Sequence, residues 1–474
     1  MYNDPSEGAI VLSEKTKREI FLTGLFAAFM FLQFAVLRLG NSAGEGYLST
    51  QRRELVYYAL QVFVILGFIG YAAFDRLPVG TRVRRGVAFF VLGVFCAGAA
   101  VLLAADRGSL FYLIVTLAVM PCLGGIGGAV YHRMSRETAA GAKTARSMGF
   151  GCSIAVVLQY LLQIQLGATP LLPVFMLAAF LWLTNLLLRA PRGLLSETEI
   201  EEAKETPPRR LMFACLIAAT FMLFTSFYNG YIHHLQIRSG YTDYNVYSWP
   251  RLILVPCYLL FAAVGDRKQG KLVPIAALCV ALVATLNSVL AGNDGAYWLN
   301  MCLFYCSIAA SVSYYDLIFW RLAQGTKHPA FWASMGRILD SVMVLLAGAL
   351  HISALPAAAV LAVNIAGIAA IVLLMTLGGD FDLTPMPLAA SDEPRLLSTE
   401  DTLDRMREQY ALTRREAEVL RELVLTEDKQ TVISERLSIQ VKTLQDYVTR
   451  LYRKTGAATR SGLTELYHAC MTGK

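Results

Sequence analysis

The chain has 474 residues, of which 56% are hydrophobic and only 16% are charged, and its formal net charge is +7. A soluble protein carries about 25% charged residues, so the composition excludes a single ordinary soluble domain. The apolar residues fall in blocks of about 20, the length that a helix needs to cross a bilayer. From residue 379 onward the sequence is rich in charge. We therefore expect a membrane domain followed by a soluble domain.

The first apolar block follows a short basic segment and is longer than the core of a secretory signal peptide. Since many more blocks follow it, we expect a membrane helix there and not a leader. A charged segment with three prolines, residues 189–210, separates two sets of six blocks and predicts a linker. The expected spans lie near residues 20–39, 55–74, 86–105, 110–130, 148–167, 170–188, 211–231, 246–264, 271–290, 296–320, 330–351 and 354–377.

Lysine and arginine are distributed unequally between the two sides of these spans. Most of them lie in the connections on the same side as the N-terminus, and cytoplasmic loops are the ones that carry an excess of basic residues. We therefore expect a multi-pass protein of the inner (cytoplasmic) membrane. Because twelve is an even number, both termini are expected in the cytoplasm, where DNA is accessible.

Two connections share a short motif. The first runs from Asp75-Arg76 to Gly80-Thr81-Arg82, and the second is Gly265-Asp266-Arg267-Lys268-Gln269-Gly270-Lys271. Glycine permits a sharp reversal, and the aspartate can bind a basic side chain of a neighbouring helix. The motif resembles the repeated loop of the major facilitator superfamily. The resemblance covers residues 15–377 and implies two six-helix halves, 15–188 and 211–377, around a central cavity.

Polar side chains within the spans are candidates for a ligand site, because such residues are costly in lipid and tend to face the interior of a bundle. The alternative is that they snorkel to the headgroups or join helices by hydrogen bonds. Tyrosine and tryptophan together with a few cations and amides suit a small aromatic or anionic molecule. The candidates are Gln33, Arg38, Gln159, Gln163, Tyr228, Asn229, His233, Trp249, Arg251 and Tyr305.

Residues 378–410 are acidic and contain three prolines, which predicts an extended tether. Beyond them, Thr413 and Glu416 form a capping-box pattern at the start of a helix over 417–424. Helices are also expected over 430–437, 441–454 and 461–471. In the helix over 441–454, Leu444, Val448 and Leu451 share the inward face.

This four-helix pattern resembles the LuxR-type helix-turn-helix domain over residues 411–474. The matching positions are Leu412, Thr413, Arg415, Glu416, Val419, Leu420, Ile433, Leu437, Ile439, Thr443, Leu451, Tyr452, Arg453, Lys454, Gly456 and Arg460. The resemblance implies DNA binding, as a homodimer, with the third helix in the major groove. The residues expected at DNA are Lys442, Thr443, Gln445, Asp446, Thr449, Arg450, Arg453, Lys454 and Arg460. Gln440 replaces the serine usual before the third helix and is a poorer N-cap.

The expected fold is therefore all-α, with a 12-helix membrane bundle and a four-helix DNA-binding domain. The main functional hypothesis is a one-component transcriptional regulator whose bundle senses a small molecule. The alternative is an active secondary transporter with an added regulatory DNA-binding domain. A third hypothesis gives the C-terminal domain a protein partner in place of DNA. Residues 77–79, inserted in the first loop motif, and the scarcity of mid-depth carboxylates favour sensing. No catalytic motif is present, so neither an enzyme, a cofactor nor a metal is expected.

Overall fold

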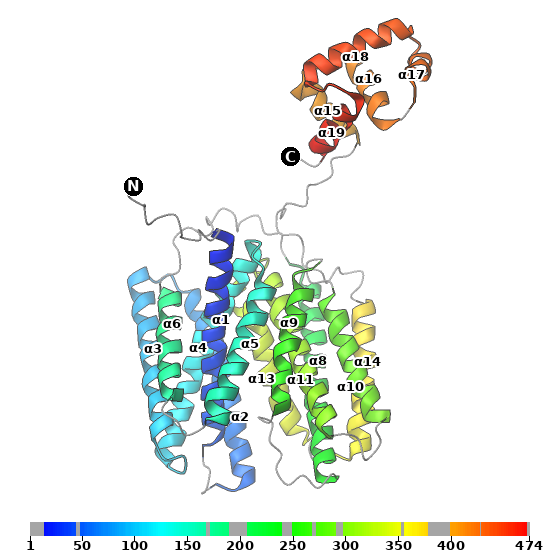
Figure 1. Cartoon of the computed structure of the whole chain (residues 1–474). Coiled ribbons are helices and arrows are strands. Elements are labelled where there is room, and N and C mark those ends of the chain that lie inside the picture. The colour runs from blue at the N-terminus through cyan, green and yellow to red at the C-terminus, as the bar shows by residue number, and fades with distance from the viewer. Residues whose placement is uncertain are drawn as a thin grey trace, which may run out of the picture. The chain divides into compact units, whose positions relative to one another are not determined.

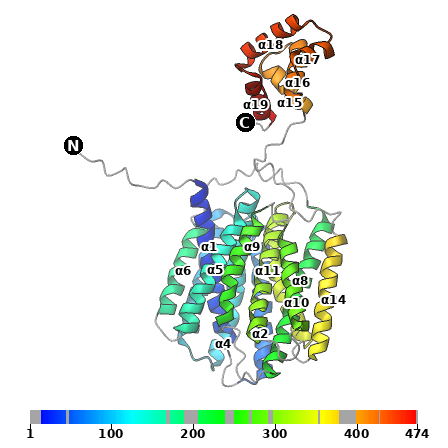
Figure 2. The ribbon, with the colours of Figure 1, turned by 45° about the vertical axis from the view of Figure 1, so that its right-hand side comes forward.

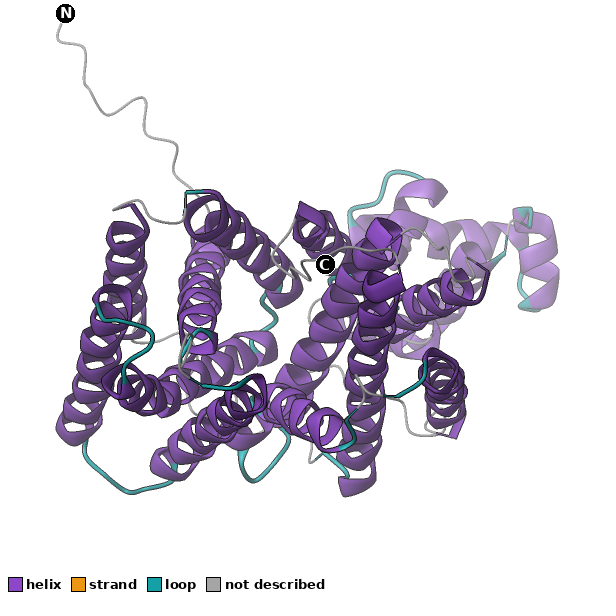
Figure 3. Ribbon diagram, turned by 90° about the horizontal axis from the view of Figure 1, so that it is seen from below, coloured by secondary structure: helices purple, strands orange, loops and turns teal. Residues whose placement is uncertain are grey.

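The structure is a computed structural model that describes residues 14–43, 48–166, 171–188, 206–238, 249–267, 272–290, 297–351, 355–377, 399–426 and 428–471. Within these ranges the regular elements are helices and no strand occurs (Figure 3). The all-α expectation is confirmed for this part of the chain. The chain divides into two compact units, residues 1–389 and 390–474.

The helices of the first unit run side by side (Figure 1). Those of its first half are α1 (Glu14–Asn41), α2 (Thr50–Asp75), α3 (Thr81–Ala104), α4 (Leu110–Ala139), α5 (Thr144–Gln159), the π-helix η1 (Tyr160–Gln165) and α6 (Leu171–Leu188). Those of its second half are α8 (Pro208–Arg238), the 3₁₀-helix η2 (Trp249–Ile253), α9 (Leu254–Gly265), α10 (Val273–Leu290), α11 (Tyr297–Ala323), α12 (Pro329–Ala333), α13 (Met335–Ala349) and α14 (Ala357–Leu377).

Among the described residues, eight helices are long and apolar enough to cross a membrane. They lie at Thr16–Asn41, Arg52–Asp75, Thr81–Ala104, Leu110–Ala139, Thr144–Gln165, Pro208–Ile232, Tyr297–Ala323 and Ala357–Leu377. Shorter apolar helices cover Leu171–Asn185, Trp249–Gly265 and Val273–Ser288. The multi-pass membrane domain is thus supported, whereas the count of twelve spans stays a prediction. Most of the expected linker at 189–210 lies outside the described residues.

The block expected near 330–351 is divided between α12 and α13. Ser334 lies at the junction, and its hydroxyl donates to the carbonyl of Ala330, four residues earlier, at 3.2 Å. Such back-bonding by serine often bends helices. Gly336, just beyond the junction, packs tightly on Tyr315, because an added Cβ would lie 2.6 Å from that ring. The break therefore brings the start of α13 close to α11.

Small residues set the closest helix contacts in the first unit. A Cβ on Gly67 of α2 would lie 2.2 Å from the carbonyl oxygen of Pro121, and one on Gly124 of α4 would lie 2.1 Å from that of Val64. A Cβ on Gly149 of α5 would lie 2.6 Å from the carbonyl oxygen of Tyr258 on α9. Figure 2 shows α5 beside α9, at a contact between the two halves. Close backbone approach at small residues is typical of membrane helices.

The second unit contains α15 (Thr399–Gln409), α16 (Arg414–Leu425), α17 (Gln430–Arg436), α18 (Val441–Thr455) and α19 (Arg460–Met471). The last four agree with the expected helices to within three residues at either end. Thr413 and Glu416 form the predicted capping box. Leu444, Val448 and Leu451 are buried as predicted, within a hydrophobic core separate from that of the first unit. A four-residue segment, 437–440, joins the short helix α17 to α18.

The extended tether predicted over 378–410 is wrong for residues 399–409, and so is the prediction of only four helices in the C-terminal domain. Residues 399–409 are helical and pack on α19 and α16, so the described part of the second unit has five helices. Leu403 and Met406 are buried in its core. These two residues and Tyr410 repeat at the three- and four-residue spacing of an apolar helix face. The prolines that suggested an extended chain lie earlier, at 385–394, in the part of the predicted tether outside the described residues.

Candidate functional site

A buried polar cluster joins the two halves of the first unit. The Tyr131 hydroxyl on α4 donates to Asp316 Oδ2 on α11 at 3.1 Å, and Arg337 Nε on α13 donates to that hydroxyl at 2.6 Å. An Arg337 Nη2 lies 3.7 Å from Asp316 Oδ2. The Asp316 side chain is 0% exposed. We call Tyr131, Asp316 and Arg337 the inter-half cluster.

Aromatic rings surround this cluster. Phe26 and Phe29 of α1, Phe68 of α2 and Trp320 of α11 pack against the ring of Tyr131, with centroid separations between 5.5 and 6.1 Å. The guanidinium of Arg337 also lies over the rings of Tyr131 and Tyr315. Aromatic walls exclude water and strengthen the electrostatic interactions within them. The cluster is therefore a desolvated ion pair held between helices of both halves.

Arg337 also lies near a second carboxylate, that of Asp340, three residues later on α13. Their closest atoms are 3.8 Å apart, but Asp340 has a side chain that is 42% exposed, whereas the cluster places buried Asp316 against the same arginine. The other carboxylate oxygen of Asp316, Oδ1, has no hydrogen-bond partner among the described residues. Buried carboxylates without full pairing are rare and are found at functional sites in membranes.

Three of the predicted ligand residues meet in a second cluster, farther along α1. Gln159 Nε2 donates to the carbonyl of Phe34 at 3.0 Å and to Gln163 Oε1 at 3.0 Å, and Gln163 Nε2 donates to the carbonyl of Ala35 at 3.1 Å. Arg251 of η2 donates to Gln159 Oε1 at 2.8 Å. We call Gln159, Gln163 and Arg251 the glutamine cluster. The π-helix η1 begins beside Gln159, and π-helical turns are frequent at functional sites.

The two clusters are neighbours along α1. Arg337 Nη2 lies 3.8 Å from the sulfur of Met30, and the glutamine cluster binds the backbone of Phe34, one helical turn later. The guanidinium of Arg251 also lies 5.3 Å from the centre of the Phe34 ring. A molecule bound at the glutamine cluster would therefore lie close to the buried ion pair.

The other predicted ligand residues are scattered. Tyr228 is buried and donates to Asn300 Oδ1 at 2.8 Å within the second half, while Trp249 is 50% exposed and packs on Trp298. Gln33 is buried on α1, and its Oε1 has no hydrogen-bond partner among the described residues. Arg38 and Asn229 are half-buried and Tyr305 is buried, whereas the side chain of His233 lies outside the described residues. Only part of the predicted set of ligand-binding residues therefore lies together in the structure.

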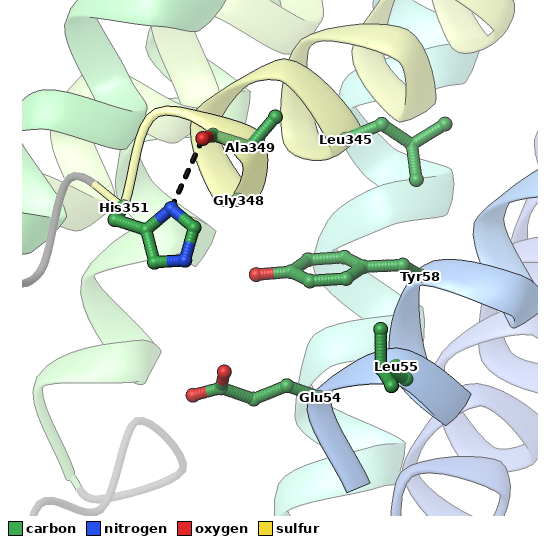
Figure 4. A pocket seen from close by; sticks show the side chains of 7 residues that line it. All are labelled: Glu54, Leu55, Tyr58, Leu345, Gly348, Ala349 and His351. Atoms are coloured by element: carbon green, nitrogen blue, oxygen red, sulfur yellow. Dashed lines mark hydrogen bonds between the residues drawn. The ribbon is translucent and has the colours of Figure 1, made fainter. Parts of the chain in front are cut away.

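A pocket of about 280 Å³ lies between α2 and the end of α13. It is lined by Glu54, Leu55, Tyr58, Leu345, Gly348, Ala349 and His351. Figure 4 shows the side chains of Glu54 and Tyr58 pointing into the space that His351 faces. Gly348 lets the Tyr58 ring contact α13, since an added Cβ would meet that ring at 2.2 Å. The pocket is another place where the halves meet, and no pattern in the sequence predicted it.

The two loop motifs bind basic side chains, as predicted. Asp75 Oδ1 accepts from Arg84 of α3 at 3.3 Å. Asp266, at the end of α9, lies 3.6 Å from Arg146 of α5, which belongs to the other half. The second motif therefore contributes to the contact between halves at the arginine-rich end of the bundle.

In the second unit, α18 exposes a polar face opposite its buried leucines. Lys442, Gln445, Asp446, Thr449, Arg450 and Arg453 are exposed, and Thr443 is half-buried. The Arg450 guanidinium lies 5.0 Å from the centre of the Tyr447 ring, which holds it along the helix surface. We call these seven polar residues, 442, 443, 445, 446, 449, 450 and 453, the α18 face.

Two residues predicted at DNA have other partners. Lys454 Nζ donates to Glu416 Oε2 at 2.7 Å and to the carbonyl of Ala411 at 3.0 Å. Arg460 donates to the carbonyls of Leu423 at 2.8 Å, Asp428 at 2.7 Å and Thr426. Both cations hold loops of their own unit together, so neither belongs to the α18 face. Sequence matching could not reveal this, because their partners lie more than 30 residues away.

One similarity to a solved structure indicates the fold of the first unit. The chain is similar to the crystal structure of the human organic anion transporter MFSD10 (TETRAN), with a TM-score of 0.51 and 15% sequence identity. The similarity covers 77% of this chain, about the share that the bundle occupies, and 100% of that chain. No family model and no curated protein sequence matches the chain. At 15% identity the likeness shows the fold alone: the chain contains a multi-pass membrane domain similar in fold to a major facilitator transporter.

Proposed function

We propose that this protein is a secondary transporter of the facilitator type that carries a DNA-binding regulatory unit at its C-terminus. The observation that carries the proposal is the buried Asp316, bonded by Tyr131 from the first half and facing Arg337 from the second. The scarcity of mid-depth carboxylates in the sequence favours a sensor. The burial of Asp316 between the halves, together with the transporter-like fold, shifts the balance toward transport.

The transport part rests on what a coupled carrier requires. Its two halves must exchange between arrangements, and the coupling ion must bind a group whose surroundings differ between them. Asp316 accepts a hydrogen bond across the halves, so separation of the halves would remove that bond and change its affinity for a proton. The glutamine cluster, one turn away along α1, supplies amides and a cation for an anionic substrate. The similar transporter acts on organic anions, so organic anions are the first class to test.

Uptake into proteoliposomes tests this part. Purified full-length protein should accumulate radiolabelled benzoate or fumarate under an imposed pH gradient, and a proton ionophore should abolish the accumulation. Asp316→Asn should reduce uptake at least tenfold, about 1.4 kcal/mol, whereas the control Asp340→Asn, at the exposed aspartate beside the same arginine, should change it less than threefold. Accumulation that is unaffected by Asp316→Asn would contradict the proposed coupling role.

The DNA-binding part rests on the second unit. A short helix, a four-residue turn and a longer helix with an exposed basic and amide face are the parts that a helix-turn-helix domain uses. Lysine and arginine bind phosphates, and glutamine can read an adenine edge in the major groove. Arg450 and Arg453 are the candidate phosphate contacts, and Gln445 is the candidate base contact.

Binding of duplex DNA at several salt concentrations tests this part. The full-length protein in lipid nanodiscs should bind a subset of fragments from its own genome, with an affinity that falls as salt rises. Replacement of both Arg450 and Arg453 by Gln should reduce the slope of log affinity against log salt by about 1.8, since each phosphate contact contributes about 0.9. An unchanged slope would contradict the placement of these arginines at phosphates.

The second candidate function is a sensor that regulates without transport. It is favoured by the first loop motif, where residues 77–79 lengthen the turn and Arg84 binds the carbonyls of Asp75 and Leu77. A pure sensor would change its DNA affinity with ligand but accumulate none of it. Ligand-dependent DNA binding without uptake by the same preparation would favour this candidate over the transporter.

A further inference from the structure

Lys454 lies in the last turn of α18, next to the exposed Arg453, but its environment differs. Its side chain is 29% exposed, and its ammonium contacts Glu416 Oε2, whose side chain is 3% exposed. That same oxygen accepts a hydrogen bond from the backbone N–H of Thr413 at 2.8 Å. Lys454 therefore binds the carboxylate that caps α16, and an ammonium held in this way is not directed at an external phosphate.

The second contact of Lys454 is with the hinge between α15 and α16. Ala411 lies in that hinge with a φ of +47°, a left-handed conformation that a non-glycine residue adopts at a cost. Its carbonyl accepts from Lys454 at 3.0 Å. The N–H groups of Ala411 and the following Leu412 bond back to α15, at the carbonyls of Glu408 and Arg407. Lys454 thus connects α18 to the chain turn that ends α15.

α15 is the first described helix of the second unit, and the chain reaches it from α14 through residues 378–398. Its buried residues, Leu403 and Met406, pack into the core that α18 shares through Leu444 and Leu451. Any change transmitted along the connecting chain therefore enters the second unit at α15. The bond from Lys454 to the carbonyl of Ala411 is a polar contact that ties the end of α15 to α18.

From this geometry we infer that Lys454 is a positioning residue for DNA binding: it fixes the end of α18 to the Ala411 hinge, so that the placement of α15 controls the DNA affinity of the α18 face. The inference rests on the proposed DNA-binding function. It assigns to Lys454 a role that neither its sequence position nor its charge suggests, since a lysine there would ordinarily be assigned to a phosphate.

The test compares Lys454→Gln with its neighbour Arg453→Gln in full-length protein in nanodiscs, by fluorescence anisotropy with a selected duplex at several salt concentrations. Lys454→Gln should weaken binding about tenfold while the salt slope stays that of the unaltered protein. Arg453→Gln should lower the slope by about 0.9. Lys454→Arg, which retains the charge and the donors, should recover most of the affinity. A slope that falls by about 0.9 in Lys454→Gln would overturn the inference.

A double variant tests the link to α15. Met406→Ser loosens the packing of α15, and we expect it to weaken DNA binding without changing the salt slope. If α15 acts through Lys454, the variant with both changes should bind no more weakly than the poorer single variant. Effects that multiply would show that α15 and Lys454 act separately, and would overturn the inference.

Hydrogen exchange gives a readout that does not depend on DNA. The amides of residues 411–416 should exchange faster in Lys454→Gln than in the unaltered protein, and should be unchanged in Arg453→Gln. Unaltered exchange in Lys454→Gln would overturn the inference even if DNA binding is established. If the unaltered protein binds no DNA at low salt, the proposed function fails, and the exchange experiment still decides whether Lys454 holds the hinge.

Discussion

In the first unit the helices bury polar side chains and expose large apolar ones, whereas the core of the second unit is apolar and its surface is rich in charge. Gln159, Asn300 and Asp316 are at most 1% exposed, while Phe90 on α3 is 71% exposed and Leu181 on α6 is 58% exposed. In the second unit Leu444 and Leu451 are fully buried and the charged residues of the α18 face are exposed. The difference follows from the solvent. Lipid is as apolar as the side chains, so the hydrophobic effect does not drive membrane helices together, and polar contacts distinguish the interior of the bundle from its surface.

The comparison predicts that removing a single charge lowers the stability of the protein most when the charge lies inside the bundle. Arg337→Leu would leave Asp316 buried opposite an apolar side chain, and the loss of one partner of a buried ion pair costs about 3–5 kcal/mol. We expect a large fall in the unfolding midpoint of the detergent-solubilised protein. Replacing both residues by Leu should restore at least half of the loss. A double variant as unstable as Arg337→Leu would contradict the assignment of the two residues as a pair.

In the second unit the corresponding ion pair joins Glu416 to Lys454, whose side chain is 29% exposed, and its effect should depend on pH. Burial raises the pKa of Glu416, but the hydrogen bonds from Lys454 and Thr413 outweigh it and hold the pKa below its usual range. The stabilisation is therefore present above about pH 4.5, the usual value, and is lost as the pH falls through the lower folded-state value. Glu416→Gln should lower the unfolding free energy of this unit by about 1–2 kcal/mol at pH 7. The unfolding midpoint of the variant should also fall less steeply as the pH is lowered into the acid range. An unchanged pH dependence in that range would count against the contact with Lys454.

A smaller effect, which should be stabilising, is expected at the N-terminus of α18 in the second unit. Gln440 is the N-cap of α18, and its side chain makes no capping hydrogen bond. Gln440→Ser should stabilise the unit by about 0.5–1 kcal/mol, because a serine hydroxyl accepts from the first free N–H groups of a helix. Thermal unfolding followed by circular dichroism checks this, with Gln440→Ala as the control that adds no acceptor. Equal midpoints for the serine and alanine variants would mean that the cap is not formed.

The smallest effect is expected for a neutral hydrogen bond in the bundle. Gln163→Leu removes the bond to the carbonyl of Ala35, while Gln159 Nε2, which also donates to Gln163, keeps its bond to the carbonyl of Phe34. Such bonds in membrane proteins are worth about 0.6 kcal/mol on average. Folding should therefore be almost unchanged, so that any large loss of substrate binding reports on the site itself. Isothermal titration with benzoate, alongside an unfolding curve, separates the two effects. A loss of stability as large as that of Arg337→Leu would contradict the claim that a neutral polar group in the bundle contributes less to stability than a charged one.

The same contrast explains which features could be predicted from the sequence. In the second unit apolar spacing identifies both the helices and their buried faces, so α16 to α19 and residues such as Leu444 were predicted correctly. α15 was missed because its acidic composition masked the spacing of Leu403 and Met406. In the bundle, apolar blocks locate the helices but not their buried faces, since lipid-facing and interior positions are both apolar. Partners such as Tyr131 and Asp316, 185 residues apart, follow only from the packing of the two halves.

Selection of DNA fragments by the full-length protein tests the central claim most directly, namely that a facilitator-type membrane domain carries a DNA-binding unit. Nanodisc-embedded protein would be mixed with a fragment library of its own genome at low salt, and the retained fragments sequenced. The matched control is the variant in which Arg450 and Arg453 are both replaced by Gln. We predict that the unaltered protein enriches a small set of sites with a common sequence and that the variant does not. Equal recovery of fragments by both proteins, with no common sequence, would contradict the account.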